Sequence, residues 1–436
     1  MNFRSVRNQS PPVSFREALF RGIAPDGGLY VPESIPALPR TFLKRIGEQT
    51  LQSAGEQILS RYIDDIPAAD LRAIIDTALD FPIPLVKLDN GLHLLELFHG
   101  PTLAFKDVGA RFMANACSYF LSVEERELTI LVATSGDTGS AVAHGFCNVP
   151  NITVYILYPS GQISRLQEQQ MTTLGGNIHA IEVKGTFDDC QLLVRKTLVD
   201  PDVLSVRALT TANSINVGRL LPQVVYYVWG IGQMTLEPQT AGAPPTVVVP
   251  TGNLGNLTAA VYAKWMGAPI GKLVAATNAN DVVPQYLRTG TFTPRPSTRT
   301  LSNAMDVGNP SNLTRLQSLY RDDVVRMRQN IEAISITDPE TLEEIRSTYR
   351  TNKHILDPHT AVGVAAARRV LERGSDSNPI IVAATAHPAK FPEIVRTAIG
   401  TTILLPEALK KALTRTKQST PIRAAYSEWK QLLLNG

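Results

Sequence analysis

Short apolar runs alternate along most of the chain with longer amphipathic segments. Four of these runs have the length and composition of buried strands: Leu128–Ala133, Ile152–Leu157, Thr246–Val249 and Ile380–Ala384. The first three are each followed by a glycine-containing turn and then by a helical pattern, over residues 141–146, 163–171 and 258–265. Nearly continuous hydrophobic strands that alternate with helices are typical of parallel sheets covered on both faces. The pattern therefore predicts an α/β fold whose ligands bind at the loops beyond the carboxyl ends of the strands.

The two ends of the chain have a different pattern. The first 84 residues contain a turn-rich segment, Pro25–Pro32, then helical patterns up to Leu79 and the connector Phe81–Pro84. From Pro406 onward the chain is amphipathic and basic, which predicts one or two surface helices. No internal repeat or low-complexity segment separates these regions.

Composition narrows the class of protein. A chain of 436 residues with 44% hydrophobic and 19% charged residues is long enough for two or three domains with sizeable cores. The net charge is +3 and the basic residues are scattered, so no stripe suited to nucleic acid is present. The apolar stretch around residues 224–231 is too short to span a membrane.

The compartment is indicated by the three cysteines and the N-terminus, and metal binding by the histidines. Cys117, Cys147 and Cys190 form no CxxC pair, which favours a reducing cytosol. The chain starts without the apolar region of a secretory signal, so we expect a cytoplasmic protein. The seven histidines show no metal-ligand spacing. His359 and His387 flank prolines, and we expect them to hold backbone groups.

Lys106 is the first candidate for chemistry. It stands among apolar residues in the segment 98–111, FHGPTLAFKDVGAR. Burial would lower the pKa of its amine and make it a useful nucleophile and base. The alternative is a structural lysine at a helix start, paired with Asp107, and these residues alone do not decide between the two.

Three polar loops could hold anions. Gly252–Asn256 follows a predicted strand and precedes a predicted helix, where glycines let N–H groups approach an anion at the positive end of the helix dipole. It matches neither a Walker loop nor the GxGxxG spacing, so a tight turn remains open. Ser135–Gly139 stands in the same position, with helix capping as its alternative. Thr211–Arg219 offers two amides, a hydroxyl and a guanidinium, and its alternative is capping plus a surface arginine. For the polar loops 303–312 and 357–361 we expect turn chemistry.

Taken together and in this order, these segments resemble the threonine synthase family, in the tryptophan-synthase-β-like group of pyridoxal-phosphate enzymes (fold type II). The matching segments begin at Val13–Phe15 and Asp26–Val31 and end at His387–Lys390, so the resemblance spans most of the chain. It implies two open parallel-sheet α/β domains with pyridoxal 5'-phosphate in the cleft between them. The expected division is an N-terminal extension at 1–84, a large domain at 85–110 and 216–405, a small domain at 111–215 and a C-terminal helical segment at 406–436.

The resemblance also implies roles for single residues. Lys106, in the motif Pro-Thr-x-x-Phe-Lys-Asp, would hold the cofactor as a Schiff base. The cofactor phosphate would be cradled by Gly252, Asn253, Leu254, Gly255 and Asn256. Thr385 would hydrogen-bond the pyridine nitrogen, which suits elimination and replacement chemistry. Ser135, Gly136 and Thr138 would bind the substrate carboxylate. Asp137 would face the cofactor ring, where relatives often have asparagine, and its protonation state is left open. The substrate phosphate would be gripped by Asn213, Ser214 and Arg219.

The reaction implied is the conversion of O-phospho-L-homoserine and water to L-threonine and phosphate, by γ-elimination and β-hydration. The expected partner is this small molecule alone, with no nucleic acid or membrane, in a monomer or a homodimer. One alternative is a phospholyase or dehydratase of the same fold that yields a 2-oxo acid, because the Asn213–Arg219 segment does not decide where water adds. Another is a non-catalytic metabolite-binding protein, against which the intact Lys106 and glycine loop argue.

Overall fold

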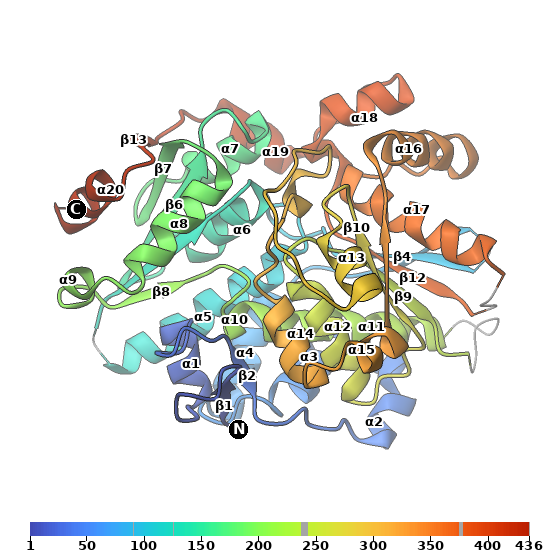
Figure 1. Ribbon diagram of the computed structural model, residues 1–436, viewed down its shortest axis with the longest axis horizontal. Coiled ribbons are helices and arrows are strands. Elements are labelled where there is room, and N and C mark those ends of the chain that lie inside the picture. The colour runs from blue at the N-terminus through green and yellow to red at the C-terminus, as the bar shows by residue number, and fades with distance from the viewer. Residues whose placement is uncertain (90, 125, 237–242, 375–377, 436) are drawn as a thin grey trace.

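Figure 1 shows the computed structural model, which describes residues 1–89, 91–124, 126–236, 243–374 and 378–435. Its strands form two large sheets and one small antiparallel pair. The two large sheets lie in separate halves of the molecule (Figure 1). Among the described residues, no helix is both long and apolar enough to cross a membrane.

The larger sheet has six strands in the order β11-β10-β9-β12-β4-β3. Its strands are β3 (Leu85–Asp89), β4 (Leu92–Glu96), β9 (Thr246–Pro250), β10 (Leu273–Thr277), β11 (Ile331–Ser335) and β12 (Ile380–Ala384). Neighbouring strands are parallel, except that β3 runs antiparallel to β4 at the edge.

The smaller sheet has five parallel strands in the order β13-β7-β6-β5-β8. Its strands are β5 (Leu128–Ala133), β6 (Ile152–Pro159), β7 (Ile178–Lys184), β8 (Leu209–Thr211) and β13 (Thr420–Arg423). The predicted strands at 128–133 and 380–384 match β5 and β12, and the two others are each extended at the carboxyl end.

Helices cover both faces of each large sheet. Those around the smaller sheet are α5 (Lys106–Glu124), α6 (Asp137–Phe146), α7 (Arg165–Thr172), α8 (Phe187–Thr197) and α9 (Pro201–Leu204). Those around the larger sheet are α10 (Val217–Leu220), η2 (Leu221–Gln223), α11 (Val224–Thr235), α12 (Gly255–Trp265), α13 (Val282–Thr289), η3 (Asn303–Met305), α14 (Leu313–Tyr320), α15 (Val324–Asn330), α16 (Asp338–Asn352), α17 (Pro358–Glu372), η4 (Pro388–Lys390) and α18 (Pro392–Ile399). The helices predicted after β5, β6 and β9 are α6, α7 and α12.

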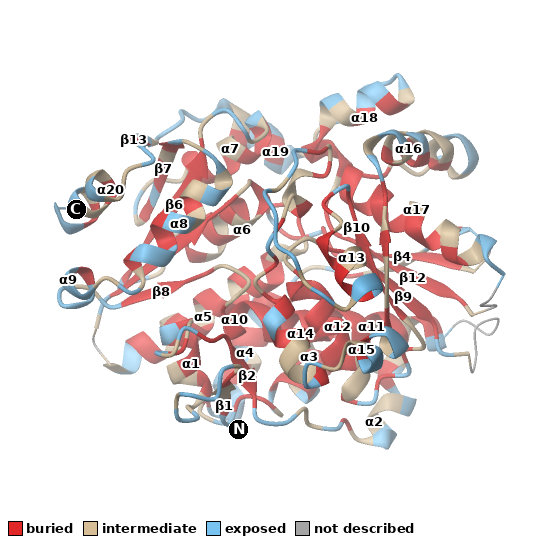
Figure 2. Ribbon diagram, viewed as in Figure 1, coloured by how far each residue is buried: buried red, intermediate tan, exposed pale blue. Residues whose placement is uncertain are grey.

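Successive residues of a strand point to opposite faces, and here both faces are buried. In β9, Val247 and Val249 join a core shared with α11 and α12, whereas Val248 joins a second core under α17. In β5, Ile130 packs in the first of these cores, and Leu131 packs under α8. Figure 2 shows the strands as buried through most of their length. This two-sided burial explains why the strands are continuous apolar runs rather than alternating patterns.

The N-terminal extension packs against the first core. It consists of the antiparallel pair β1 (Phe3–Ser5) and β2 (Tyr30–Pro32) with α1 (Phe15–Arg21), α2 (Arg40–Lys44), η1 (Ile46–Glu48), α3 (Leu51–Leu59) and α4 (Ala68–Ala78). Phe3 and Phe15 are fully buried, with ring centroids 6.1 Å apart.

The C-terminal segment contains the expected helices, α19 (Glu407–Thr414) and α20 (Tyr426–Asn435), and also the strand β13, which the sequence pattern did not indicate. Trp429 of α20 is fully buried, and its indole N–H donates to the Thr197 hydroxyl group at 2.8 Å. The segment is therefore built into the smaller sheet and its helical cover, because one face of α20 is apolar.

Candidate active site

A cleft of about 950 Å³, including its opening to solvent, lies at the carboxyl ends of strands from both sheets. The residues after β5, β8, β9 and β12 line it, together with the start of α5. Of the predicted site residues, the lining includes Lys106, Ser135, Asp137, Thr138, Asn213, Ser214, Arg219, Gly252, Asn253, Leu254, Gly255, Asn256 and Thr385. Gly136 is not among the lining residues.

Lys106 opens α5 and reaches the cleft from a segment held against the larger sheet. Phe105 N–H donates to the Thr385 carbonyl at 2.9 Å, and Tyr226 donates to the Phe105 carbonyl. Burial lowers the pKa of Lys106 to about 8, Asp137 opposes the shift, and the positive charge of Arg219 adds to it. In the described part of the chain Lys106 forms no ion pair, so the alternative pairing with Asp107 is not observed. Such a lysine is suited to act as a nucleophile and a base.

The glycine loop Gly252–Asn256 presents free backbone donors to the cleft. In the described structure none of its five N–H groups donates to a protein acceptor. Leu254 adopts a left-handed conformation with φ of 61°, and α12 begins at the next residue without a side-chain cap. A helix N-terminus with unpaired N–H groups is an anion site. The loop thus fits the phosphate group of pyridoxal phosphate.

The Ser135–Thr138 loop begins α6 in a similar way. The Thr134 hydroxyl accepts the N–H groups of Gly136 and Gly139, at 2.9 and 2.8 Å. The N–H groups of Ser135, Asp137 and Thr138 have no acceptor among the described residues. These three groups can hold a carboxylate at the helix N-terminus.

Gly136 has a conformational role in this loop. Its φ is 132°, and a Cβ atom there would lie 2.5 Å from the Gln167 side chain. Its N–H donates to the Thr134 hydroxyl group, and its lack of a side chain allows the turn.

Arg219 is a buried cation at the floor of the cleft. Its guanidinium donates to the Ala212 carbonyl and, at 3.5 Å, to the Lys106 carbonyl. It forms no ion pair with any described carboxylate, and its Nε atom has no hydrogen-bond partner there. Burial lowers its pKa to about 10, so it stays protonated near neutral pH. An unpaired buried guanidinium favours an anionic ligand.

The predicted phosphate residues Asn213 and Ser214 have other contacts. The Asn213 amide group accepts from the Ala133 N–H at 3.1 Å and donates to its carbonyl at 2.7 Å, which joins the ends of β5 and β8. The Ser214 hydroxyl accepts from Asn253 at 2.9 Å and from Asn312 at 3.2 Å. The Ser214 side chain therefore contacts the glycine loop, although its backbone is part of the segment 211–219.

Sequence reasoning missed Arg315, which is fully buried on α14. Its guanidinium donates to the carbonyl groups of Tyr30, Ser214 and Ile215 and to the Asn312 side chain, at 2.5–3.1 Å. None of these acceptors is charged. Nothing local distinguishes this arginine from a surface one, because its partners come from distant segments.

Two loops expected to serve only as turns also line the cleft, through Ala304–Val307 and His359. His359 Nε2 accepts the Ala304 N–H at 3.2 Å, so the ring proton is on Nδ1, which donates to Asp357 at 2.9 Å. His387 Nδ1 accepts the Ala389 N–H at 3.1 Å. Both histidines thus hold backbone groups as expected.

Among the described residues, no hydrogen bond occupies the Thr385 hydroxyl group.

Asp137 is ionised in this setting. Burial by itself would raise the pKa of its carboxyl group, but the positive charges of Lys390 and Lys106 outweigh burial and hold the pKa well below the ordinary value. The Nζ atom of Lys390 lies 2.7 Å from Asp137 Oδ1, and both side chains are almost completely buried. The charge with the largest effect is that of Lys390, which lies on η4 in the other half of the molecule.

Comparisons with known proteins identify the family of the chain. Residues 77–385 match the family model described as pyridoxal-phosphate dependent enzyme. Residues 2–79 match threonine synthase N terminus, and residues 360–433 match threonine synthase, C-terminal. The chain is 39% identical to threonine synthase of Serratia marcescens, over 100% of this chain and 99% of the relative.

Two solved structures resemble the whole chain. Threonine synthase from Escherichia coli has a TM-score of 0.93 at 38% identity and covers 100% of both chains. Threonine synthase from Brucella melitensis with bound pyridoxal phosphate has a TM-score of 0.92 at 34% identity, over 100% of this chain and 99% of that one.

Proposed function

The chain belongs to the threonine synthase family of pyridoxal-phosphate-dependent enzymes, and on this premise we propose that it converts O-phospho-L-homoserine and water to L-threonine and phosphate. It is a pyridoxal-phosphate-dependent lyase. The observation that carries the proposal is the placement of Arg219, a buried guanidinium without a carboxylate partner in the described structure, beside the backbone of Lys106. Arg219 and Lys106 together suit a substrate that has an anionic group close to its reacting carbons.

Pyridoxal phosphate would be held by Lys106, by the free N–H groups of Gly252–Asn256 and by the Thr385 hydroxyl group. When bound, it supplies an electron sink that stabilises negative charge next to the substrate nitrogen. The fit rests on the five N–H groups of this loop, in and before the first turn of α12, which have no acceptor among the described residues.

Lys106 would move the protons. Once its Nζ atom is free, it can take a proton from the α-carbon and then from the β-carbon of the substrate, because its pKa of about 8 leaves a useful fraction unprotonated near neutral pH. The same group can return a proton at the γ-carbon after phosphate has left. Water then adds its hydroxyl group at the β-carbon, the proton taken from the α-carbon is returned there, and the remaining proton of water leaves with the phosphate.

The two anionic groups of the substrate would be held at opposite sides of Lys106. The N–H groups of Ser135, Asp137 and Thr138 would bind the carboxylate at the start of α6. Arg219 and Ser214 would bind the phosphate and stabilise the charge that grows as it leaves. Asn213 would act through its contacts with Ala133, by fixing the distance between these two sites.

Product analysis tests this function. Purified protein with pyridoxal phosphate and O-phospho-L-homoserine should release threonine and phosphate in equal amounts. Release of phosphate with 2-oxobutyrate would establish a lyase of the alternative kind instead. Absence of any product, with the cofactor bound, would point to another phosphorylated amino acid.

We propose the cytoplasm as the compartment. The three cysteines are free in the structure, and Cys117 and Cys190 are buried, as suits a reducing environment. We propose that the protein binds its small-molecule substrate as a monomer or as a homodimer. Light scattering of the purified protein distinguishes these two oligomeric states.

A further inference from the structure

The ion pair between Asp137 and Lys390 joins the two halves of the molecule. Asp137 begins α6 directly after the smaller sheet, and Lys390 ends η4 after strand β12 of the larger sheet. The side chain of Lys390 is 0% exposed and that of Asp137 is 5% exposed. Lys390 also donates to the Thr102 carbonyl at 2.9 Å, in the segment that leads to Lys106. One buried ammonium group therefore contacts two of the segments that form the cleft.

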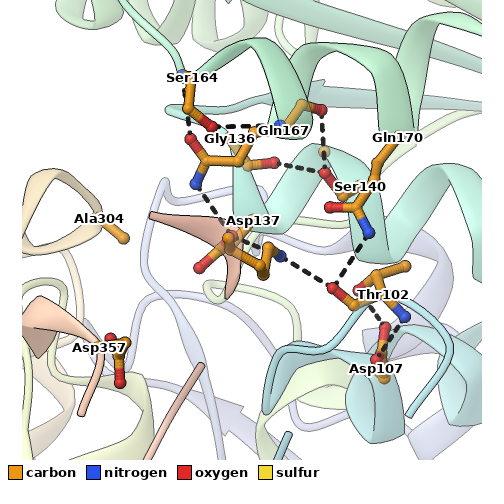
Figure 3. Close-up of polar contacts among 12 residues, drawn as sticks. Thr102, Asp107, Gly136, Asp137, Ser140, Ser164, Gln167, Gln170, Ala304 and Asp357 are labelled. Atoms are coloured by element: carbon orange, nitrogen blue, oxygen red, sulfur yellow. Dashed lines mark hydrogen bonds and ion pairs between the residues drawn. The ribbon is translucent and has the colours of Figure 1, made fainter. Parts of the chain in front are cut away.

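The contacts of Asp137 are divided between its two oxygens. Oδ1 receives Lys390 at 2.7 Å and the Gln167 amide group at 3.0 Å. Gln167 is itself held, because Ser140 donates to its carbonyl and Ser164 caps its helix. Oδ2 receives no hydrogen bond from the described residues, and Figure 3 shows it pointing away from the network. Since Asp137 lines the cleft, Oδ2 is the oxygen left for a ligand.

Three positive or titratable groups face this carboxylate from different elements: Lys390 from η4, Lys106 from α5 and His359 from α17. Lys106 changes its bonding during the proposed reaction, so its charge is not constant. The Nε2 atom of His359 accepts the Ala304 N–H at 3.2 Å, and its Nδ1 atom contacts Asp357 at 2.9 Å. Lys390 is not among the cleft-lining residues and has a fixed partner on each side. It is the cation that stays beside Asp137 throughout.

We propose that Lys390 is a positioning residue that keeps Asp137 ionised and directs Oδ2 into the cleft, where it accepts a hydrogen bond from an O–H or N–H group of the bound ligand. The inference rests on the proposed function, because it assigns Asp137 to the same cleft and reaction. An ionised acceptor fixes the proton on the ligand side of this hydrogen bond. Lys390 thereby sets a protonation state of the ligand without touching it.

The first test is the absorbance of the cofactor-loaded protein as a function of pH. In Lys390→Met the buried carboxyl group loses its fixed counter-charge, and burial then raises its pKa. We expect a spectral transition between about pH 5 and 8 that wild type lacks. Asp137→Asn/Lys390→Met should lack this transition, because the titrating group is gone. A spectrum of Lys390→Met that titrates like wild type, or a transition that persists in the double variant, overturns the proposal.

The second test is thermal unfolding without cofactor, which does not depend on activity. In Lys390→Met the folded-state pKa of Asp137 is raised, so stability is present below the unfolded pKa of about 4 and is lost as pH rises. The Tm of this variant should therefore fall between about pH 4 and 7 relative to the double variant. If Lys390→Met does not fold at pH 7, recovery of folding in the double variant supports the same coupling. Equal Tm values for both variants at every pH overturn it.

Two further variants separate a positioning role from loss of a lysine in general. Lys390→Arg retains the charge and should have the wild-type spectrum. The kcat of Lys390→Met should fall by at least about tenfold, which corresponds to a change of one unit in the pKa of the Asp137 carboxyl group. Lys430→Met removes a lysine paired with Asp200 and Asp202 away from the cleft and should leave the spectrum unchanged. If wild type yields no threonine but these spectra behave as expected, the proposed function fails and the role of Lys390 stands.

Discussion

The Asn253 amide group donates to the Ser214 hydroxyl group at 2.9 Å, so the two loops predicted to hold different phosphate groups are in direct contact. A Cβ atom on Gly255 would lie 3.2 Å from the Cβ atom of Ser214, which is a close approach of the two segments. The cofactor and substrate phosphates would therefore share one wall of the cleft. Affinities for the two are expected to be coupled.

Ser214→Ala tests this coupling. Removal of the hydroxyl group leaves the Asn253 amide donor without its acceptor and loosens the glycine loop, at a cost of roughly 1–3 kcal/mol. We expect weaker binding of pyridoxal phosphate as well as a higher KM for the phosphorylated substrate. Equilibrium titration of cofactor-free protein measures the first effect. An unchanged cofactor affinity with a raised KM would assign Ser214 to the substrate alone.

Lys106→Ala should abolish turnover, because no other described lysine lines the cleft. General acid-base groups contribute about 10²–10⁴-fold, so kcat should fall by at least about 100-fold. The assay is threonine release at saturating cofactor, with Lys417→Ala, a surface lysine paired with Glu168 and Glu182, as the control. Activity within about tenfold of wild type would remove Lys106 from the reaction.

The pKa of Lys106 predicts how the cofactor-free protein reacts with aldehydes. Burial lowers this pKa to about 8, and protonation blocks the nitrogen lone pair. The rate of cofactor attachment should therefore rise with pH and level off above about pH 8. A free lysine side chain, with a pKa of about 10.4, provides the reference curve. Stopped-flow absorbance gives both profiles, and coincident midpoints would contradict the prediction.

Arg219→Ala should act mainly on the phosphorylated substrate. The loss of a buried charge partner weakens binding by roughly 2–4 kcal/mol. Inorganic phosphate serves as a probe: its inhibition constant should increase together with KM. Arg219 also holds the carbonyl groups of Ala212 and Lys106, so a melting curve of each variant shows whether the fold is retained. Arg219→Lys should recover part of the affinity, since it keeps the charge without the bidentate geometry.

Arg315→Met should destabilise the protein and weaken phosphate binding together. The substitution leaves the carbonyl groups of Tyr30, Ser214 and Ile215 without their donor, at about 1–3 kcal/mol for each buried group that water does not reach. Thermal unfolding and cofactor titration are the measurements. Arg45→Met, which removes an arginine from an exposed ion pair with Glu48, is the control. A variant with normal Tm and normal cofactor affinity would show that Arg315 does not hold the loop.

The sequence by itself determined the strands and the loops that follow them. Strands such as Leu128–Ala133 and Ile380–Ala384 are buried on both faces, so their apolar runs are visible without knowledge of their neighbours. The glycines at 252 and 255 and the lysine at 106 also stand out locally, because the turn or the charge departs from the surrounding pattern. In parallel sheets the carboxyl ends of strands meet at one edge, so the cleft followed from the same information.

Only the tertiary structure decided which groups meet inside the cleft. Lys390 is no different in sequence from a surface lysine, and its burial against Asp137 depends on the packing of η4 beside α6. Strand β13 is short, with one buried residue, and its place is fixed by pairing with β7 rather than by its own pattern. Contacts between distant segments depend on the path of the whole chain, and local propensity carries no information about that path.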